Sequence, residues 1–173
     1  MNLVLIGYMG SGKSLVGKRL ADTLNYKYLD LDEVISTREQ KTISEIFSER
    51  GEIYFRRIEG ELLKEILDSQ DNIVLATGGG TPCYGNTMDF ISSTDSSLSV
   101  YLSSTLDTLT ERLFDERSSR PLIAHLPDKE LLKDFIRKHL FERSFYYNQA
   151  DHVVDVSEGT PDELVKKIVA LLF

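Results

Sequence analysis

Residues 7–14 of the chain read GYMGSGKS, and this stretch fits the phosphate-binding pattern G-x-x-x-x-G-K-[ST]. The apolar run Leu3–Ile6 precedes it, and residues 15–21 follow it with helical spacing. A strand, a glycine-rich loop and a helix in this order let backbone N–H groups and the helix N-terminus point at phosphate oxygens. A glycine-rich turn without chemical meaning would not need all three. The stretch therefore predicts a loop that binds a nucleoside triphosphate.

The residues of this loop have distinct expected roles. Lys13 supplies a mobile cation for the β- and γ-phosphates, and the hydroxyl of Ser14 is a ligand for Mg²⁺. The helix is expected to start near Ser11 and to add the positive end of its dipole. Nucleotide contacts in this segment are expected at Gly10, Ser11, Gly12, Lys13, Ser14 and Leu15.

The periodicity of the remaining chain predicts an α/β fold. Short apolar runs that are typical of strands occur at Leu3–Ile6, Tyr28–Leu31, Ile73–Ala76, Leu98–Leu102 and His152–Val156. Helical patterns separate them, at Lys13–Leu24, Asp32–Gln40, Thr42–Ser48, Glu52–Ser69, Thr105–Phe114, Asp128–Asn148 and Pro161–Phe173. This alternation predicts a five-stranded parallel sheet with helices on both faces, a three-layer α/β/α arrangement. Residues 1–173 contain no repeat or low-complexity linker and are expected to form a single domain.

Composition narrows the classes of function. The net charge is −8 and no large cluster of Lys and Arg occurs, so a small-molecule acceptor is expected rather than a nucleic acid. Apolar stretches are much shorter than a membrane span, and no signal peptide is expected before a strand that begins at residue 3. The single Cys83 fits a reducing cytoplasm and is expected to be structural or incidental, and the three histidines have no metal-ligand spacing.

Two acidic residues lie at the carboxyl end of the second predicted strand. Asp30 and Asp32 are expected to lie on the same side of that strand, at the edge of the sheet where ligands gather. One of them could approach Mg²⁺ through water while the other orients an acceptor hydroxyl. The alternative is that Asp32 only caps the next helix.

A triple glycine and two arginines complete the candidate residues. The stretch of residues 78–80 ends the third predicted strand, and three glycines favour close approach of the backbone to a ligand, although a plain turn stays open. Arg56 and Arg143 lie in predicted helices. Arginines suit a carboxylate or a phosphate, but isolated helical arginines are mostly solvated.

One segment breaks the α/β pattern. Residues 115–127 are too long and too polar for a tight connection, so they are expected to form a mobile lid over the phosphates, with a surface loop as the alternative. The segment carries Arg120 before Pro121.

In this order and spacing, the motifs resemble the shikimate kinase family of P-loop proteins, in the nucleoside-monophosphate-kinase-like group. The shared stretches are GYMGSGKS, LDLDE, ISEIFSERGEIYFRRIE, TGGG, SSRPLI and ERSFYY, which together cover nearly the whole chain. The resemblance implies ATP-dependent phosphorylation of the 3-hydroxyl of shikimate, within aromatic amino-acid biosynthesis. It also implies that ATP and Mg²⁺ are required and that the acceptor-binding helical segment covers about residues 32–60.

The resemblance assigns roles by motif. Lys13, Asp32 and Arg120 would be catalytic, with Arg120 and Arg112 contacting ATP. Ser14, and Asp30 through water, would hold Mg²⁺. The acceptor would bind to Asp32, Arg56, Gly78, Gly79, Gly80 and Arg143, where the two arginines hold its carboxylate. The adenine loop of the family often carries a basic residue before a proline; here Glu158 and Gly159 stand there, so adenine contact is expected to rest on backbone groups and Arg112.

Other functions stay open at this point. A related small-molecule kinase, such as one for gluconate, would be expected to lack the combination of TGGG, FRR and Asp-x-Asp. A non-catalytic nucleotide-binding module would need no acceptor residues, and a kinase domain detached from a larger polypeptide is a further possibility. We expect a monomer that binds shikimate and ATP and associates with neither nucleic acid nor membrane.

Overall fold

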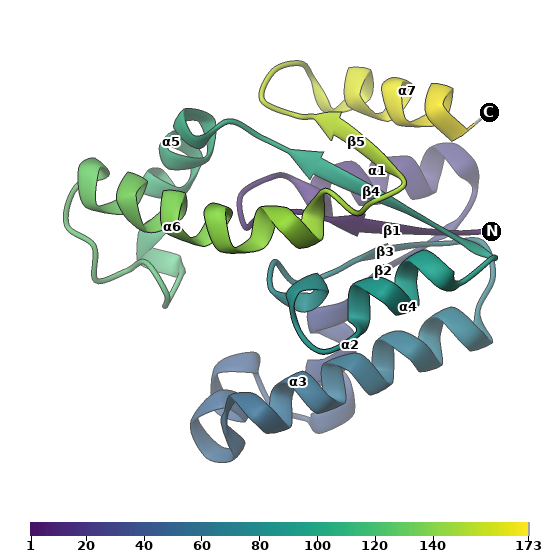
Figure 1. Cartoon of the computed structure of the whole chain (residues 1–173), viewed down its shortest axis with the longest axis horizontal. Helices are drawn as coiled ribbons and strands as arrows, with labels where there is room; N and C mark the ends of the chain where they lie inside the picture. Colours follow the sequence, from purple (N-terminus) through teal and green to yellow (C-terminus); the bar gives the residue numbers. More distant parts are fainter. Residues whose placement is uncertain (173) are drawn as a thin grey trace.

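A five-stranded parallel sheet of order β2-β3-β1-β4-β5 is the centre of the computed structural model, which describes residues 1–172 (Figure 1). The strands are β1 (Asn2–Ile6), β2 (Lys27–Asp30), β3 (Ile73–Ala76), β4 (Ser97–Ser103) and β5 (His152–Asp155). All four strand pairs are parallel. The predicted α/β class and its five strands are confirmed, and the strand ends differ by one residue at most.

Seven helices surround the sheet. They are α1 (Lys13–Leu24), α2 (Leu31–Glu39), α3 (Ile43–Ser69), α4 (Thr87–Ser93), α5 (Leu106–Glu116), α6 (Lys129–Tyr147) and α7 (Pro161–Leu172) among residues 1–172. The short helix α4 has no counterpart among the predicted helices. Phe173, the last residue of the predicted C-terminal helix, lies outside the described residues.

Helix α3 covers two of the predicted helices. Gly51 interrupts it with φ 80° and ψ 173°, so the helical geometry stops there and resumes at the next residue. Thr42 caps the first part, since its side chain accepts from the backbone N–H of Glu45 while the Glu45 carboxylate accepts from that of Thr42. The two helices predicted on either side of residue 50 are therefore one helix, α3, with a break at Gly51.

The strand β1 separates two layers of core. Leu3 and Leu5 pack with residues of α1 and α7, whereas Val4 and Ile6 pack with residues of the helices on the other face. All four side chains are 0% exposed, which follows from a strand that has neighbours on both edges and helices on both faces. Figure 1 shows α1 and α7 on one side of the sheet and α4 on the other.

The topology determines where a ligand can bind. After β1 the chain forms β2 and β3 on one side of β1, and it then crosses to β4 on the other side. The strand β3 thus pairs with one edge of β1 and β4 with the other. In open parallel sheets, ligands bind beyond the carboxyl ends of the strands where the strand order reverses. The loop after β1 starts at this point, and in Figure 1 α5 and α6 lie beyond the same ends of the strands.

Within residues 1–172, no helix has the length and apolar content that crossing a bilayer would require.

Two glycines on helices give a matched test of this packing. A Cβ at Gly17 on α1 would lie 2.7 Å from Tyr28 Cε2 and 3.0 Å from Leu5 Cδ1, whereas a Cβ at Gly60 on α3 would meet nothing within 4 Å. We expect Gly60→Ala to stabilise the protein by about 0.5–1 kcal/mol through helix propensity. Gly17→Ala should instead destabilise it by about 1–3 kcal/mol because the core there is full.

Urea unfolding of the two variants and the wild type measures both changes. If Gly17→Ala were as stabilising as Gly60→Ala, α1 would not be packed on β1 and β2 as closely as described.

Candidate active site

A cavity of about 550 Å³ lies at the carboxyl edge of the sheet. It brings together most of the residues singled out from the sequence, which come from the loop after β1, the start of α2, the turn after β3 and helix α5. These lining residues include Gly10, Ser11, Gly12, Lys13, Ser14, Leu15, Asp30, Asp32, Gly78, Gly79, Arg112 and Arg120. Three predicted residues, Arg56, Gly80 and Arg143, stand beside this cavity rather than in its lining.

The glycine-rich loop has the geometry that its sequence predicts. Gly10 and Gly12 adopt φ values of 77° and 90°, which residues with a Cβ rarely take. Helix α1 begins at Lys13, two residues later than the predicted start near Ser11, because Gly12 occupies the left-handed cap position. The first backbone N–H groups of α1 therefore belong to Lys13 and Ser14, next to the cavity.

Lys13 is folded back onto its own loop. Its Nζ donates hydrogen bonds to the carbonyl oxygens of Gly7 (2.8 Å) and Tyr8 (2.9 Å). Burial lowers the pKa of Lys13 to about 8, although the carboxylates of Asp32 and Asp30 oppose the shift. An incoming anion beside this ammonium group would raise its pKa again and favour its charged form.

The expected geometry of Asp30 and Asp32 is wrong. The strand β2 ends at Asp30 and α2 begins at Leu31, so the two carboxylates do not share one side of a strand. Asp30, not Asp32, caps the helix: its Oδ1 accepts from the backbone N–H of Asp32 (3.0 Å) and of Glu33 (3.4 Å). Asp30, the residue expected to approach Mg²⁺, is therefore also the helix cap, a role that was expected as the alternative for Asp32.

The second oxygen of Asp30 faces the phosphate loop. Asp30 Oδ2 lies 3.5 Å from Ser14 Oγ and accepts from the hydroxyl of Tyr28 at 3.4 Å. A serine hydroxyl and a carboxylate oxygen are hard ligands of the kind that Mg²⁺ prefers, and Mg²⁺ usually keeps several waters and binds substrate phosphates as well. Among residues 1–172, no group of three or more His, Cys, Asp or Glu side chains is arranged to hold a metal ion.

The capping role of Asp30 leaves Asp32 free to face the cavity. Burial is the main reason why the pKa of Asp32 is raised to about 6, with further contributions from the charges of Asp30 and Glu59, while Lys13 and Arg56 oppose them. A carboxylate whose pKa lies this close to neutrality is suited to accept a proton.

The triple-glycine turn is the point where the acceptor-binding candidates converge. A Cβ at Gly78 would lie 3.4 Å from Asp32 Oδ1, one at Gly79 would lie 3.3 Å from Arg143 Nη1, and one at Gly80 would lie 2.7 Å from Arg56 Nη2. None of the three has a positive φ. Space therefore requires the glycine most clearly at Gly80 and less strictly at Gly79, whereas at Gly78 the tight contact of a Cβ would be with Thr81 Oγ1, at 3.0 Å.

Glu59 is a site residue that sequence reasoning missed. It is 2% exposed, and its carboxylate accepts from Arg56 Nη1 (2.8 Å) and from Thr81 Oγ1 (2.6 Å). The ring of Tyr84 lies 4.0 Å from the guanidinium carbon of Arg56, whose buried Nε makes no hydrogen bond within the described residues and lies 3.7 Å from Glu52 Oε1. The signal in the sequence is the spacing of three between Arg56 and Glu59 on one helix, which places both on the same face.

The segment of residues 115–127 is more ordered than its sequence suggests. Helix α5 continues to Glu116, a single 3₁₀ turn covers Arg117–Ser119, and the side chain of Ile123 is 0% exposed in the main core cluster. Ile123 thus anchors a segment that is otherwise polar to the core. Leu126 also packs against the same cluster.

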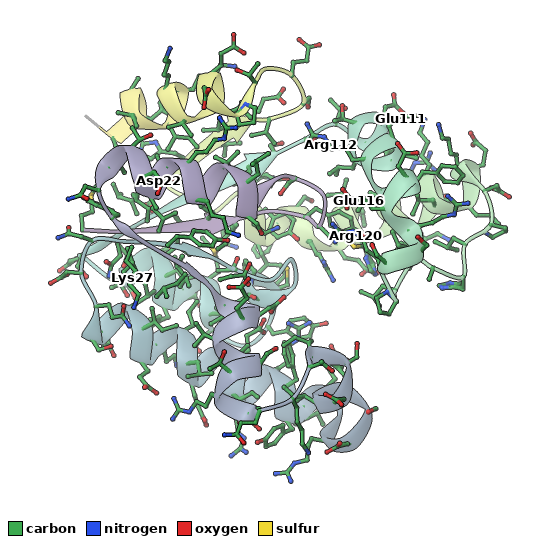
Figure 2. All side chains as sticks on the ribbon, turned by 180° about the vertical axis from the view of Figure 1, so that it is seen from behind. Asp22, Lys27, Glu111, Arg112, Glu116 and Arg120 are labelled. Atoms are coloured by element: carbon green, nitrogen blue, oxygen red, sulfur yellow. The ribbon has the colours of Figure 1, made fainter. Side chains whose placement is uncertain are left out.

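Arg120 and Arg112 both reach the nucleotide cavity from α5 or its end. Arg120 donates from Nε and Nη2 to one carboxylate oxygen of Glu116, at 3.0 and 2.6 Å. Arg112 donates to the carbonyl oxygens of Val156 (2.9 Å) and Gly10 (3.3 Å), so it joins the loop after β5 to the phosphate loop. Figure 2 shows Arg112, Glu116 and Arg120 between α5 and the phosphate loop.

The single cysteine, Cys83, was expected to be structural or incidental rather than a nucleophile. Burial raises the pKa of the Cys83 thiol to about 11, so at neutral pH the thiolate that a nucleophile requires is scarce.

Comparison with known proteins points to one family. A family model described as shikimate kinase matches residues 9–173. The shikimate kinase of Flavobacterium johnsoniae is 48% identical over 170 residues, which cover 98% of both chains. The crystal structure of shikimate kinase from Bacteroides thetaiotaomicron has a TM-score of 0.92 at 35% identity and covers 99% of this chain and 98% of that one.

Two further solved structures bear on the acceptor. A shikimate kinase from Acinetobacter baumannii, in complex with shikimate, has a TM-score of 0.85 at 31% identity and covers 99% of this chain and 92% of that one. A gluconokinase from Sinorhizobium meliloti has a TM-score of 0.51 at 18% identity and covers 98% of this chain and 89% of that one, a likeness that extends to the fold alone.

The crowding at Gly80 gives a test of the acceptor side of the site. In Gly80→Ala the new Cβ would displace the guanidinium of Arg56, so we expect the KM for shikimate to rise by roughly 10-fold, the loss of about one hydrogen bond to a charged group. The KM for ATP should change less than about twofold because Gly80 does not line the nucleotide cavity. Steady-state kinetics of the variant, with Gly60→Ala as the control, measure both constants. An increase confined to the KM for ATP would contradict the placement of Arg56.

Proposed function

The chain belongs to the shikimate kinase family, and we propose that it transfers the γ-phosphate of ATP to the 3-hydroxyl of shikimate, giving shikimate 3-phosphate and ADP. Its class is that of a phosphotransferase with an alcohol group as acceptor. The observation that carries the proposal is the convergence of Asp32, Arg56 and Arg143 on the triple-glycine turn, beside a phosphate loop.

The charges of the site match those of the acceptor. Shikimate has one carboxylate and three hydroxyl groups, and we assign the carboxylate to the guanidinium groups of Arg56 and Arg143. The Nε of Arg56 supports this assignment, because it is buried, makes no hydrogen bond within the described residues and has only the carboxylate of Glu52 nearby, at 3.7 Å, so a ligand oxygen could accept from it. Asp32 would accept a hydrogen bond from a hydroxyl, and the backbone at Gly79 would contact the ring substituents.

The nucleotide would lie across the phosphate loop. The N-terminus of α1, Lys13 and Arg120 together supply positive charge for the phosphates, and Arg112 is placed to contact adenine from the side of the loop after β5. Ser14, with Asp30 acting through water, would hold Mg²⁺, which neutralises charge on the β- and γ-phosphates when it is bound. The residues present fit both groups.

In the reaction, the acceptor hydroxyl oxygen forms a bond to the γ-phosphorus while the bond from that phosphorus to the β,γ-bridging oxygen breaks. Asp32 takes the hydroxyl proton, and ADP leaves with its new negative charge. Lys13 would exchange the carbonyl oxygens of Gly7 and Tyr8 for phosphate oxygens, and Arg120 would exchange Glu116 for them. Such electrostatic contacts supply most of the rate enhancement in phosphoryl transfer.

Several features remain predictions from the sequence. They are a single domain over residues 1–173, an acceptor-binding segment at about residues 32–60, a lid at about residues 115–127 that closes over the phosphates, and a monomer located in the cytoplasm. Association with nucleic acid or a membrane is not expected.

The first prediction tests the acceptor. ADP release should depend on shikimate in the presence of ATP and Mg²⁺, and gluconate should not replace shikimate. Asp32→Asn should lower the turnover number by about 10²–10⁴-fold, because the amide cannot take the hydroxyl proton. A coupled assay of ADP measures these rates, with Lys13→Ala as a control expected to lose about 10²–10³-fold. Turnover with gluconate, or full activity of Asp32→Asn, would contradict the proposal.

The second prediction concerns the pair of Glu116 and Arg120. Because Glu116 competes with phosphate for Arg120, Glu116→Gln should lower the KM for ATP, by roughly 2- to 5-fold for a half-exposed ion pair. Glu111→Gln is the matched control, since Glu111 lies on the same helix but pairs with Lys129 instead. A higher KM for ATP in Glu116→Gln would mean that Glu116 orients Arg120 for catalysis instead of withholding it.

A further inference from the structure

A hydrogen bond joins the phosphate loop to α6 through residues that have no assigned role. Tyr8 occupies a position of the loop where the motif accepts any side chain. Its side chain is 1% exposed and turns away from the nucleotide cavity, and its hydroxyl lies 3.0 Å from His139 Nδ1, 131 positions later in the chain. The phosphate loop does not need this long-range hydrogen bond to bind phosphate, which indicates that the bond has a different role in the site.

The geometry allows Tyr8 to be the donor of this bond. Burial raises the pKa of the Tyr8 phenol, so the hydroxyl keeps its proton. Burial and the positive charge of Arg143 lower the pKa of His139 while Glu142 opposes them, and Nδ1 accepts from Tyr8 in the tautomer that carries its proton on Nε2. Phe135 also packs against the imidazole ring of His139, with ring centroids 4.4 Å apart, and so restricts the movement of that ring.

Tyr8 also contacts the two cations that the reaction uses. The face of its ring lies 5.6 Å from the guanidinium carbon of Arg143, within the range of a cation–π interaction. Its backbone carbonyl accepts from Lys13 Nζ. One residue therefore lies between the lysine assigned to the phosphates and the arginine assigned to the acceptor carboxylate.

Helix α6 is tied on both sides of Arg143. His139, Arg143 and Tyr147 are spaced by four residues and so share one face of the helix. Tyr147 is 0% exposed, and its hydroxyl donates to the carbonyl oxygen of Gly79. The helix is thus bound to the phosphate loop one turn before Arg143 and to the triple-glycine turn one turn after it.

We propose that Tyr8 and His139 are positioning residues, and that their hydrogen bond holds Arg143 at the distance from the phosphate loop at which it receives the acceptor carboxylate. The inference rests on the proposed function, which assigns that carboxylate to Arg143. An arginine side chain has many rotamers, and the turn of helix that carries it must be fixed for its guanidinium to meet a second arginine across the acceptor.

Tyr8→Phe removes the hydroxyl and keeps the ring under Arg143. We expect the KM for shikimate to rise by about 3- to 10-fold, the range for loss of one hydrogen bond, with less than about a twofold change in the KM for ATP. Tyr101→Phe is the matched control, because Tyr101 is also buried in the same core cluster but stacks on Tyr147 rather than on Arg143.

A second pair of variants tests the same bond from α6. His139→Asn keeps an acceptor atom near the position of Nδ1 and should retain most of the affinity for shikimate, whereas His139→Leu should match Tyr8→Phe. This pair carries the test if Tyr8→Phe proves to be unfolded.

Coupling to Arg143 separates positioning from simple stabilisation. In an Arg143→Ala background, Tyr8→Phe should raise the KM for shikimate by less than about twofold, because the residue through which it acts is gone. An equal effect with and without Arg143, or an unchanged KM in the single variant, would overturn the inference. Absence of shikimate-dependent ADP release by the wild type would instead overturn the proposed function itself, and the inference with it.

Discussion

Everything in this site depends on the burial of β1. The strand is hydrogen-bonded to β3 and β4, and its four apolar side chains divide between the two core layers with no exposed surface. A slip of one residue would exchange the two sets of side chains between the layers, so the register is strongly determined. Because the phosphate loop starts at the next residue, its place relative to the turn after β3 is determined as well.

Charge is the second constraint on the site. Burial is the main reason why the pKa of Lys13 falls to about 8 and that of Asp32 rises to about 6, and opposite charges nearby oppose both shifts. Positive and negative side chains therefore alternate in the site. Arg56 pairs with Glu59 and Arg120 pairs with Glu116. Lys13 lies near the carboxylates of Asp30 and Asp32. Ligands that bring their own negative charge would shift this balance toward the charged form of Lys13.

Much of this arrangement could be predicted from the chain. The strands and the phosphate loop follow from local patterns, since a buried strand and a G-x-x-x-x-G-K-S stretch each leave a signature within ten residues. Asp32, Arg56 and Arg143 were found because their motifs resemble those of a known family. Glu59, the cap made by Asp30 and the anchor made by Ile123 were missed, because each depends on which face of an element turns inward after packing. Tyr8 and His139 illustrate the same limit, as no sequence pattern pairs residues 131 positions apart.

The break at Gly51 has a mechanical meaning for the long helix α3. An unbroken helix of 27 residues would be a stiff rod of about 40 Å, and a force on its tip would act as a torque at its base. Arg56 and Glu59 lie past the break, on the part of the helix that packs into the core through Phe55 and Ile58. Because of the break, the first two turns of α3, which pack into the core through Ile46, do not act as a lever on the part of the helix that places Arg56 at the triple-glycine turn.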